Sequence, residues 1–337
     1  MEFKKNMSIK ELNSFNIDVR CKLFCKIISS DDIIQLLKSE EFNKHKSILI
    51  GGGSNILFTK DFNGLLIQNN IKGITEISET NLYKTIKVGA GENWHEFVLW
   101  SIKNNLSGIE NLSLIPGNVG ASPIQNIGAY GVEVKSVVDK VWAIDILKKK
   151  EVIFSNRECE FDYRSSVFKS KLKDKIIITH VSFNLSKEPN HNTSYNDIKK
   201  ELKSQKLDVS TKNISSAIIK IRRRKLPDPS KLGNAGSFFK NPIISKLKFK
   251  ELQIKFPEIV GYKSSKNEMK IAAAWLIDSC GWKGFRKGDI GVHKNQALVL
   301  VNYGNGKGEE ILSLAKDIEE SVKKKFDITL VPEVNII

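Results

Sequence analysis

The chain has 337 residues, of which 40% are hydrophobic and 27% charged, and its formal net charge at pH 7 is +16. This length exceeds one ordinary core and the apolar content is too high for a disordered protein, so two or three folded units are expected. The N-terminal segment lacks the apolar core of a signal peptide, and no apolar run approaches the roughly 18 residues of a membrane helix, so we expect a cytoplasmic protein.

The first predicted unit, residues 1–70, alternates a helix with short strands. Residues 27–42 predict a strand end and a short amphipathic helix, and residues 47–50 predict a buried strand that runs straight into Gly51-Gly-Gly-Ser-Asn55. A further strand is expected at residues 65–67. This order is typical of a small α/β module.

The second predicted unit, residues 71–225, carries a larger sheet. Residues 85–88 predict a strand that ends in Gly89-Ala-Gly91 and passes into a helix from Trp94 to Asn104, where backbone amides could face an anion. A mainly antiparallel sheet is predicted from the alternating stretches at residues 137–146, 151–154 and 175–185. A helix over residues 214–224 is expected to close the unit.

The third predicted unit, residues 226–326, begins at Leu226-Pro-Asp-Pro229, whose prolines prevent helix continuation. Its elements are expected at residues 269–278 (helix), 296–301 (strand) and 309–325 (helix). Residues 327–337 are apolar and strand-like, and we expect them to return to a sheet formed earlier in the chain. Together the three units predict an α+β protein.

A segment with almost no charge, Leu114 to Glu133, is unusually rich in glycine. Its glycines are Gly117, Gly120, Gly128 and Gly131, and its prolines are Pro116 and Pro123. Glycines at this density allow left-handed turns and bring backbone amides close to a ligand, while the prolines stiffen the path. A large, flat, partly anionic cofactor would fit such a loop, and a buried crossover between two sheets is the structural alternative.

Common nucleotide and metal motifs do not fit the chain. Ile56 stands where the third glycine of a dinucleotide-binding fingerprint belongs, and the glycine cluster at residues 304–308 lacks P-loop spacing. Leu99 stands where a zinc-binding helix containing His95 and Glu96 needs its second histidine. With only five histidines spread along the chain, we expect no metal site.

The positive charge has two interpretations. Lysines scattered over predicted surfaces favour compositional bias, whereas the run Ile221-Arg-Arg-Arg-Lys225 could grip phosphates, so nucleic-acid binding is kept as a weaker alternative. The cysteines are too few and too irregular for a disulfide framework, so reduced thiols are expected at Cys21, Cys25, Cys159 and Cys280.

Six short blocks occur in order along nearly the whole chain. They are Gly51-Gly-Gly-Ser-Asn-Ile-Leu-Phe58, Val88-Gly-Ala-Gly-Glu-Asn-Trp94, Ile115-Pro-Gly117 with Asn126-Ile-Gly-Ala-Tyr-Gly131, Phe161-Asp-Tyr-Arg164, Gly236-Ser-Phe-Phe-Lys-Asn-Pro242 and Pro332-Glu-Val334. Together they resemble the UDP-N-acetylenolpyruvoylglucosamine reductase family, in its longer type with a tyrosine loop. Asn118 and Ala121 depart modestly from the family's pattern.

The resemblance implies a fold and a division into domains. An FAD-binding unit of the vanillyl-alcohol-oxidase type would consist of two α/β subdomains, residues 1–70 and 71–225. A separate α+β substrate-binding domain would cover residues 226–326. Residues 327–337 would then form a strand that returns to the FAD-binding unit.

The implied cofactor is non-covalent FAD, with NADPH as the reductant. Glycine-rich backbone would approach the cofactor where side chains would crowd it. The implied contacts are Gly51, Gly52, Gly53, Ser54, Asn55, Gly117, Ser122, Pro123, Asn126, Gly128, Ala129 and Tyr130. A flavin oxidase of the same fold, often with covalent FAD, is the competing class, and the preference for NADPH over NADH stays open.

Three residues match the family's catalytic positions. Arg164, in the Tyr-Arg motif, would hold the carboxylate of the substrate, and Ser237 would donate a proton. Glu333, in the Pro-Glu-Val motif, would donate a hydrogen bond if burial keeps it protonated in part. Without the resemblance, Arg164 would be assigned to a structural ion pair, Glu333 to solvent, and Ser237 to a turn or cap.

The implied reaction reduces the enolpyruvyl ether of a UDP-sugar to UDP-N-acetylmuramate for peptidoglycan. Tyr195, in His191-Asn-Thr-Ser-Tyr195, resembles the tyrosine of a loop that covers the substrate. Lys225 and Asn241 match positions that hold the diphosphate and uridine, and Gln296 is assigned to the same site. No nucleic-acid partner is expected, and the oligomeric state stays open with a monomer as the default.

Overall fold

The computed structural model describes all 337 residues, and the chain divides into two compact units. Unit 1 contains residues 1–7, 21–52 and 63–224, and unit 2 contains residues 8–20, 53–62 and 225–337. Each unit is described by itself below. The functional division predicted at residues 70, 225 and 326 stays a prediction.

The smaller sheet of unit 1 has four strands. In spatial order they are β1 (Lys4–Ser8), β2 (Arg20–Ile27), β5 (Phe62–Asn69) and β3 (Ser47–Ile50). β3 and β5 run parallel, and the short helices α1 (Ser30–Leu36) and α2 (Glu40–Lys44) connect β2 to β3. Ile33 and Leu36 of α1 pack with Leu65 and Ile67 of β5 in a buried cluster, which is the α/β alternation that the sequence predicts.

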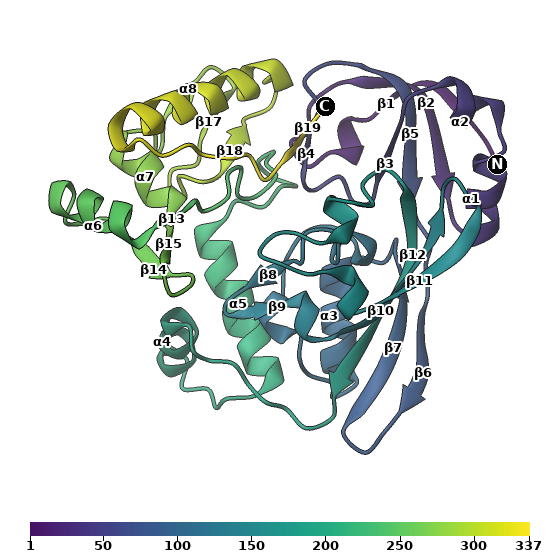
Figure 1. The fold of residues 1–337 in the computed structure, drawn as a ribbon, viewed down its shortest axis with the longest axis horizontal. Helices are drawn as coiled ribbons and strands as arrows, with labels where there is room; N and C mark the ends of the chain where they lie inside the picture. The colour runs from purple at the N-terminus through teal and green to yellow at the C-terminus, as the bar shows by residue number, and fades with distance from the viewer. The chain divides into compact units, whose positions relative to one another are not determined.

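The larger sheet of unit 1 has five strands and is antiparallel throughout, as predicted. In spatial order the strands are β11 (Lys150–Ser155), β10 (Val138–Asp145), β12 (Ile176–Ser186), β7 (Tyr83–Gly89) and β6 (Ile74–Glu79). Figure 1 shows helix α3 (Trp94–Lys103) beside this sheet. Alternate residues of β7 and β12, including Ile86, Val88 and Phe183, point into the core that α3 covers.

Trp94 ties the start of α3 to the segment that precedes the glycine-rich loop. The side chain of Asn93 caps the helix. The buried indole of Trp94 meets the ring of Phe183 edge-on, with centroids 5.9 Å apart. Its Nε1 donates a hydrogen bond of 2.9 Å to the carbonyl oxygen of Leu112. The entry to the loop is therefore fixed by the main core of unit 1.

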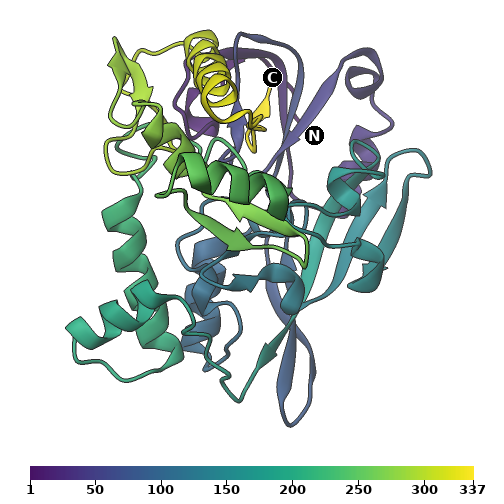
Figure 2. The ribbon, with the colours of Figure 1, turned by 60° about the vertical axis from the view of Figure 1, so that its left-hand side comes forward.

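Two helices and a hairpin complete unit 1. Helices α4 (Asn196–Ser204) and α5 (Thr211–Lys225) share a small apolar cluster, and Figure 2 shows them as neighbours. The hairpin lies inside the glycine-rich loop and pairs β8 (Gly128–Ala129) with β9 (Val132–Glu133). Tyr130, at the tip of this hairpin, packs against the apolar cluster of the helices.

Unit 2 contains three small sheets. The first has the order β13 (Ile243–Ser245), β15 (Glu268–Ile271), β14 (Gly261–Lys263), and the second has the order β16 (Arg286–Lys287), β17 (Ile290–Val292), β18 (Leu300–Asn302). Both are antiparallel. In the third, β19 (Asn335–Ile336) pairs parallel with β4 (Ile56–Leu57).

The helices of unit 2 are α6 (Lys246–Lys255), α7 (Ala273–Ser279) and α8 (Gly308–Phe326). α8 is the longest helix of the chain, with 19 residues, and it buries one apolar face that includes Ile311, Ile318 and Val322. No helix in the structure is both long enough and apolar enough to cross a membrane.

Two predicted elements of unit 2 are wrong in their extent. The helix predicted to begin at Met269 begins at Ala273, because residues 268–271 form strand β15 between two partner strands. Apolar periodicity does not distinguish a short strand from the first turn of a helix. The strand predicted from Gln296 is restricted to Leu300–Asn302, since the preceding residues form a turn in which the His293 amide bonds the Val299 carbonyl.

Candidate active site

Three turns that contain glycine meet in unit 1. A side-chain carbon on Gly52 would lie 2.8 Å from the Oδ1 atom of Asn118 and 3.3 Å from the Cα atom of Gly117. Asn118 in turn donates a hydrogen bond of 3.1 Å to the carbonyl oxygen of Gly91. Three turns that the sequence assigns to an anionic cofactor therefore lie together, with little room for side chains at Gly52.

The side chain of Asn126 forms hydrogen bonds that fix the conformation of the glycine-rich loop. It is fully buried and has a left-handed backbone, with φ of 44°. Its amide nitrogen donates to the Glu133 carboxylate and to the Asp162 carbonyl, each at 3.0 Å, and its Oδ1 atom accepts from the Lys135 amide at 3.1 Å. These bonds tie both ends of the β8–β9 hairpin to the segment that carries Arg164.

Arg164 lies directly against the glycine-rich loop. Its Nη2 atom donates a bond of 2.6 Å to the Gly128 carbonyl, and its Nη1 atom lies 3.5 Å from the Asn126 carbonyl. A side-chain carbon on Gly128 would lie 3.0 Å from Nη1. The space beside Gly128, which the resemblance assigns to the cofactor, is thus occupied in part by the half-buried side chain of Arg164.

The tyrosine loop packs on the same hairpin. The Nδ2 atom of Asn111 donates to the carbonyl oxygens of Tyr130 and Asn192, at 2.9 and 3.0 Å. Asn192 donates to the Gly131 carbonyl at 3.1 Å. The rings of Tyr130 and Tyr195 meet edge to face with centroids 5.5 Å apart, and Tyr195 is 46% exposed. Tyr195 therefore presents an accessible ring beside the glycine-rich loop.

The part of the loop around Ser122 fits a cofactor contact. Ser122 follows the 3-10 turn Val119–Ala121, precedes Pro123, and is buried. Its hydroxyl oxygen is shielded from solvent and has no hydrogen-bond partner within the protein. Buried polar atoms are nearly always hydrogen-bonded, and a polar group of FAD would supply the missing hydrogen-bond partner. The residues that would hold FAD in unit 1 thus fit that group.

Unit 2 brings Ser237 and Glu333 onto neighbouring backbone segments. The amide of Phe238 donates to the Leu298 carbonyl and the amide of Glu333 donates to the Phe238 carbonyl, both at 2.7 Å. Residues 237–239 therefore run as an extended segment between two others. Ser237 and Glu333 are both half-buried. Arg164 belongs to unit 1.

The second half of the first glycine turn belongs to unit 2. Gly53 has a φ of 60°, and a side-chain carbon there would lie 1.9 Å from the Leu12 carbonyl oxygen, so no larger residue fits. Ser54 and Asn55 follow and are half-buried. The Nδ2 atom of Asn55 donates to the Glu333 carbonyl at 3.2 Å. This predicted cofactor turn is thus joined directly to the segment that carries a predicted catalytic residue.

The residues predicted to bind substrate in unit 2 have distinct local environments. Lys225 is exposed at the end of α5. The Oδ1 atom of Asn241 accepts a bond of 3.0 Å from the Ala273 amide, so this side chain also orders the start of α7. Gln296 is half-buried in the turn before β18, and its Oε1 atom accepts from the Leu298 amide at 3.4 Å.

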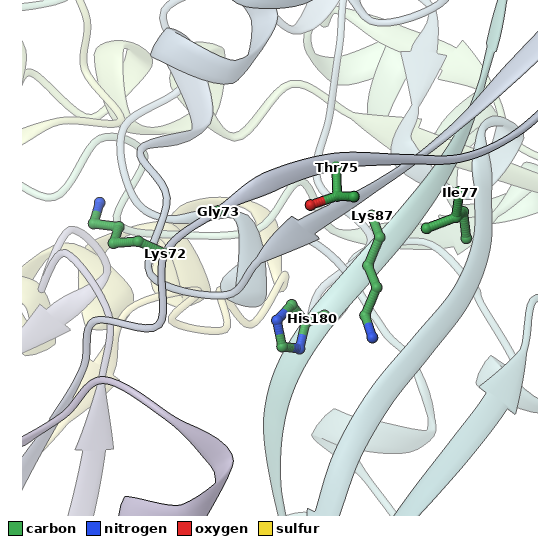
Figure 3. Close-up of a pocket in the computed structure, with 6 residues that line it drawn as sticks. All are labelled: Lys72, Gly73, Thr75, Ile77, Lys87 and His180. Atoms are coloured by element: carbon green, nitrogen blue, oxygen red, sulfur yellow. The ribbon is translucent and has the colours of Figure 1, made fainter.

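A hollow of about 290 Å³ lies elsewhere in unit 1 and contains none of the predicted site residues. Figure 3 shows Lys87 and His180 on adjacent strands of the five-stranded sheet, with Lys72 at the other end of the hollow. Burial and the charge of Lys87 lower the pKa of His180 to about 4, so the imidazole is neutral at pH 7.

Two asparagines of the site were not predicted from the sequence. Asn118 contacts the first glycine turn, although in sequence it stands out only as a departure from the family's pattern. Its position inside the glycine-rich loop is a signal that could have identified it. Asn111 bridges two loops from a buried position, and its sequence surroundings give no comparable signal.

Comparison with known proteins first defines the class. Residues 22–153 match the family model described as "FAD binding domain", and the orphaned Ser122 hydroxyl lies in that range. The protein is thus a flavoprotein, and these residues belong to its FAD-binding unit. Residues 228–337 match the model described as "UDP-N-acetylenolpyruvoylglucosamine reductase, C-terminal domain".

Curated relatives then define the family. Proteins named UDP-N-acetylenolpyruvoylglucosamine reductase from Flavobacterium johnsoniae and Amoebophilus asiaticus are 48% and 46% identical, each over 100% of both chains. The Pseudomonas aeruginosa protein of that name is 41% identical over 100% of this chain and 99% of its own length. The chain belongs to the UDP-N-acetylenolpyruvoylglucosamine reductase family and is an FAD-dependent oxidoreductase.

A solved structure supports the fold. The crystal structure of UDP-N-acetylenolpyruvylglucosamine reductase from Thermus caldophilus covers 100% of this chain and 99% of its own, with a TM-score of 0.69 and 20% sequence identity. The α+β fold with an FAD-binding unit and a separate C-terminal domain, as predicted from the resemblance, is confirmed.

Proposed function

We propose that this enzyme uses NADPH to reduce the enolpyruvyl ether of UDP-N-acetylglucosamine enolpyruvate to UDP-N-acetylmuramate in peptidoglycan precursor synthesis. Besides membership of the family, one observation carries the proposal. The Glu333 amide donates a hydrogen bond to the carbonyl oxygen of Phe238, so the segments that carry Ser237 and Glu333 lie side by side. That pairing supports a hydroxyl and a carboxyl group acting on one substrate. A cytoplasmic location is part of the proposal and is supported by four cysteines that are all free thiols.

Arg164 is the proposed electrostatic partner of the substrate. When bound, FAD would supply the hydride, taken from NADPH, that the vinyl carbon of the enolpyruvyl group needs. Negative charge then develops on the neighbouring carbon and its carboxylate, and fixed donors aimed at that charge lower the barrier. The two backbone carbonyls that hold Arg164 orient its guanidinium before the reaction. Removal of one such donor typically costs about 2.7–4 kcal/mol.

Glu333 and Ser237 are proposed to complete the reaction. Glu333 donates a hydrogen bond from its protonated carboxyl group to the developing charge, which requires a site that favours the neutral form. Ser237 gives its hydroxyl proton to the basic carbon and recovers it from water. Their half-buried positions on adjacent extended segments support these roles, because extended backbone held on two sides positions side chains well.

The remaining predicted residues are proposed as binding groups. Backbone of the two glycine turns and of the hairpin, with the Ser122 hydroxyl, would hold FAD. The exposed ring of Tyr195 would cover the sugar nucleotide, while Lys225, Asn241 and Gln296 would bind its polar groups. The edge-to-face contact with Tyr130 supports the role of Tyr195, since it positions an accessible ring beside the loop.

Stopped-flow spectroscopy tests the proposed function. The purified protein should be yellow, its flavin absorbance should bleach on mixing with NADPH, and the absorbance should return on addition of the enolpyruvyl sugar nucleotide under nitrogen. Return of the absorbance only on admission of oxygen would contradict the proposal and would favour the flavin oxidase alternative. Release of all the flavin by acid precipitation is the expected control result for non-covalent FAD.

A further inference from the structure

Asn111 joins the two loops that the proposed function assigns to the cofactor and to the sugar nucleotide. Its side chain is 1% exposed. Both hydrogens of its Nδ2 group are used, because this atom donates to the Tyr130 carbonyl at 2.9 Å and to the Asn192 carbonyl at 3.0 Å. Tyr130 is the tip of the β8–β9 hairpin, and Asn192 belongs to the tyrosine loop, residues 191–195. One buried side chain therefore sets the distance between the two loops.

The segment that carries Asn111 is itself fixed by two helices. Asn111 is the middle residue of a buried 3-10 turn, residues 110–112. Trp94 of helix α3 donates its indole hydrogen bond to the carbonyl of the residue that follows Asn111. The hydroxyl of Ser113 lies 2.8 Å from the hydroxyl of Ser215 in helix α5, and the two share a hydrogen bond. Since both helices hold this turn, Asn111 is a fixed point against which a loop can be positioned.

The hold of Asn111 on the tyrosine loop reaches Tyr195 through Asn192. The Oδ1 atom of Asn192 accepts hydrogen bonds from the amide and the hydroxyl of Ser194, at 3.0 and 2.7 Å. Its Nδ2 atom donates to the Gly131 carbonyl at 3.1 Å. Ser194 is followed directly by Tyr195. Asn111 therefore holds the backbone of Asn192, and the side chain of Asn192 orders the residue next to the tyrosine ring.

The contact between the two tyrosine rings depends on this arrangement. The rings of Tyr130 and Tyr195 meet edge to face with centroids 5.5 Å apart, and Tyr195 is 46% exposed. A contact between two rings adds only a modest amount to the stability of a loop, above all where one ring is largely in water. Asn111 holds the backbone that carries both rings, that of Tyr130 directly and that of Tyr195 through Asn192.

We propose that Asn111 is a positioning residue of this enzyme, which holds the tyrosine loop where Tyr195 covers the sugar nucleotide. The inference rests on the proposed function, because that function assigns Tyr195 to the substrate. Both donors of the Asn111 amide bond the protein's own backbone, so Asn111 acts through the loop and takes no part in hydride or proton transfer. Its removal should therefore weaken substrate binding and leave the rate at saturating substrate unchanged.

A double-mutant cycle separates this positioning role from a purely structural one. Asn111→Ala removes both hydrogen bonds, Tyr195→Ala removes the ring, and a third variant carries both changes. The dissociation constant of the enolpyruvyl sugar nucleotide is measured for each flavin-saturated holoenzyme from the change in flavin absorbance. Asn111→Ala should weaken binding about three- to tenfold, the usual effect of a lost hydrogen bond, and keep kcat within twofold. With Tyr195→Ala already present, the same change should weaken binding less than about twofold, because the residue through which Asn111 acts is gone.

Asn156→Ala is the matched control. The Nδ2 atom of Asn156 also donates to two backbone carbonyls, those of Lys135 and Val138, at 2.8 and 2.7 Å. Neither carbonyl belongs to the glycine-rich loop or to the tyrosine loop. The control should therefore lose stability in urea unfolding and keep the dissociation constant of the sugar nucleotide within about twofold of wild type.

Four outcomes overturn the proposal. They are an unchanged dissociation constant in Asn111→Ala, an equal effect of this change with and without the Tyr195 ring, an equal loss of binding in Asn156→Ala, and wild-type binding by Tyr195→Ala. Should Asn111→Ala fail to fold, Asn192→Ala removes the bond to the Gly131 carbonyl from a half-buried position and should give the same pattern. A wild-type protein that neither binds nor reduces the sugar nucleotide would instead refute the proposed function.

Discussion

Gly128→Ala tests whether the glycine-rich loop positions Arg164. Gly128 does not have the left-handed backbone that disfavours alanine, so the substitution changes mainly the space available. The new methyl group would lie 2.9 Å from the Cγ atom of Glu133, 3.0 Å from the Nη1 atom of Arg164 and 3.1 Å from the Val132 carbonyl oxygen. Because these atoms surround it on several sides, something must move by a few tenths of an ångström.

The size of the effect follows from these contacts. Overpacking of this kind costs about 1–3 kcal/mol of folding stability. The guanidinium is the most easily displaced of the three groups, and its shift would lengthen the 2.6 Å bond to the Gly128 carbonyl. Misplacement of a positioning group by about 1 Å can cost roughly 100-fold in rate. We therefore expect substrate-dependent reoxidation of the flavin to slow by about 10- to 100-fold, while reduction by NADPH stays within threefold.

Stopped-flow measurement of both half-reactions, together with urea unfolding, checks this expectation. Gly281→Ala is the matched control, because Gly281 has a φ of 83° and open space around it, so alanine there costs about 1 kcal/mol of backbone strain without touching Arg164. The control should lose stability but keep both rates. If Gly128→Ala loses stability and keeps the reoxidation rate, the coupling between the loop and Arg164 is refuted.

Three further predictions concern Ser237, Tyr195 and His180. Ser237→Ala should leave reduction by NADPH fast and slow reoxidation by substrate by orders of magnitude in stopped flow, and equal losses in both steps would argue against a proton donor. Tyr195→Ala should raise the KM for the sugar nucleotide about tenfold in steady-state assays, whereas Tyr195→Phe, which keeps the ring against Tyr130, should raise it less. The pKa of His180 is about 4 in the folded protein against 6.5 ordinarily, so the unfolded chain binds more protons between these values and stability falls as pH drops from 6.5 to 4. His180→Asn should reduce that loss by about 1–3 kcal/mol in urea unfolding, with the partly exposed ring keeping the effect below its full value, and an unchanged pH dependence would contradict the assignment.

The elements that the sequence predicts well are those whose pattern is set locally. The strand Ser47–Ile50 occurs with the predicted bounds, and helix α3 begins at Trp94 because Asn93 caps it. The antiparallel sheet follows from alternation along β10 and β12. Residues 269–271, by contrast, form a strand because two other strands pair with them, and that pairing depends on chain segments far away in sequence.

For the candidate site, sequence motifs indicate which residues to examine but not what each one touches. Gly128 illustrates this difference, since its missing side chain makes room for Arg164 as well as for the expected cofactor. Asn241 is assigned to substrate by resemblance, and the structure also gives it the task of ordering α7. The Nε atom of Arg222 is shielded from solvent and has no hydrogen-bond partner in the protein, which a run of basic residues in the sequence does not reveal.

The parallel pairing of β19 with β4 has a practical consequence. The Ile337 carbonyl accepts hydrogen bonds from the Thr59 amide and hydroxyl, at 2.8 and 2.7 Å, and the Asn335 amide donates to Asn55 at 3.1 Å. Glu333 lies two residues before β19. Trimming residues 335–337 would remove one support of the segment that carries Glu333, the proposed hydrogen-bond donor, without removing Glu333 itself, so we expect a shortened protein to fold yet work poorly. A protein made for biochemical study should therefore keep residues 335–337, so that β19 can pair with β4.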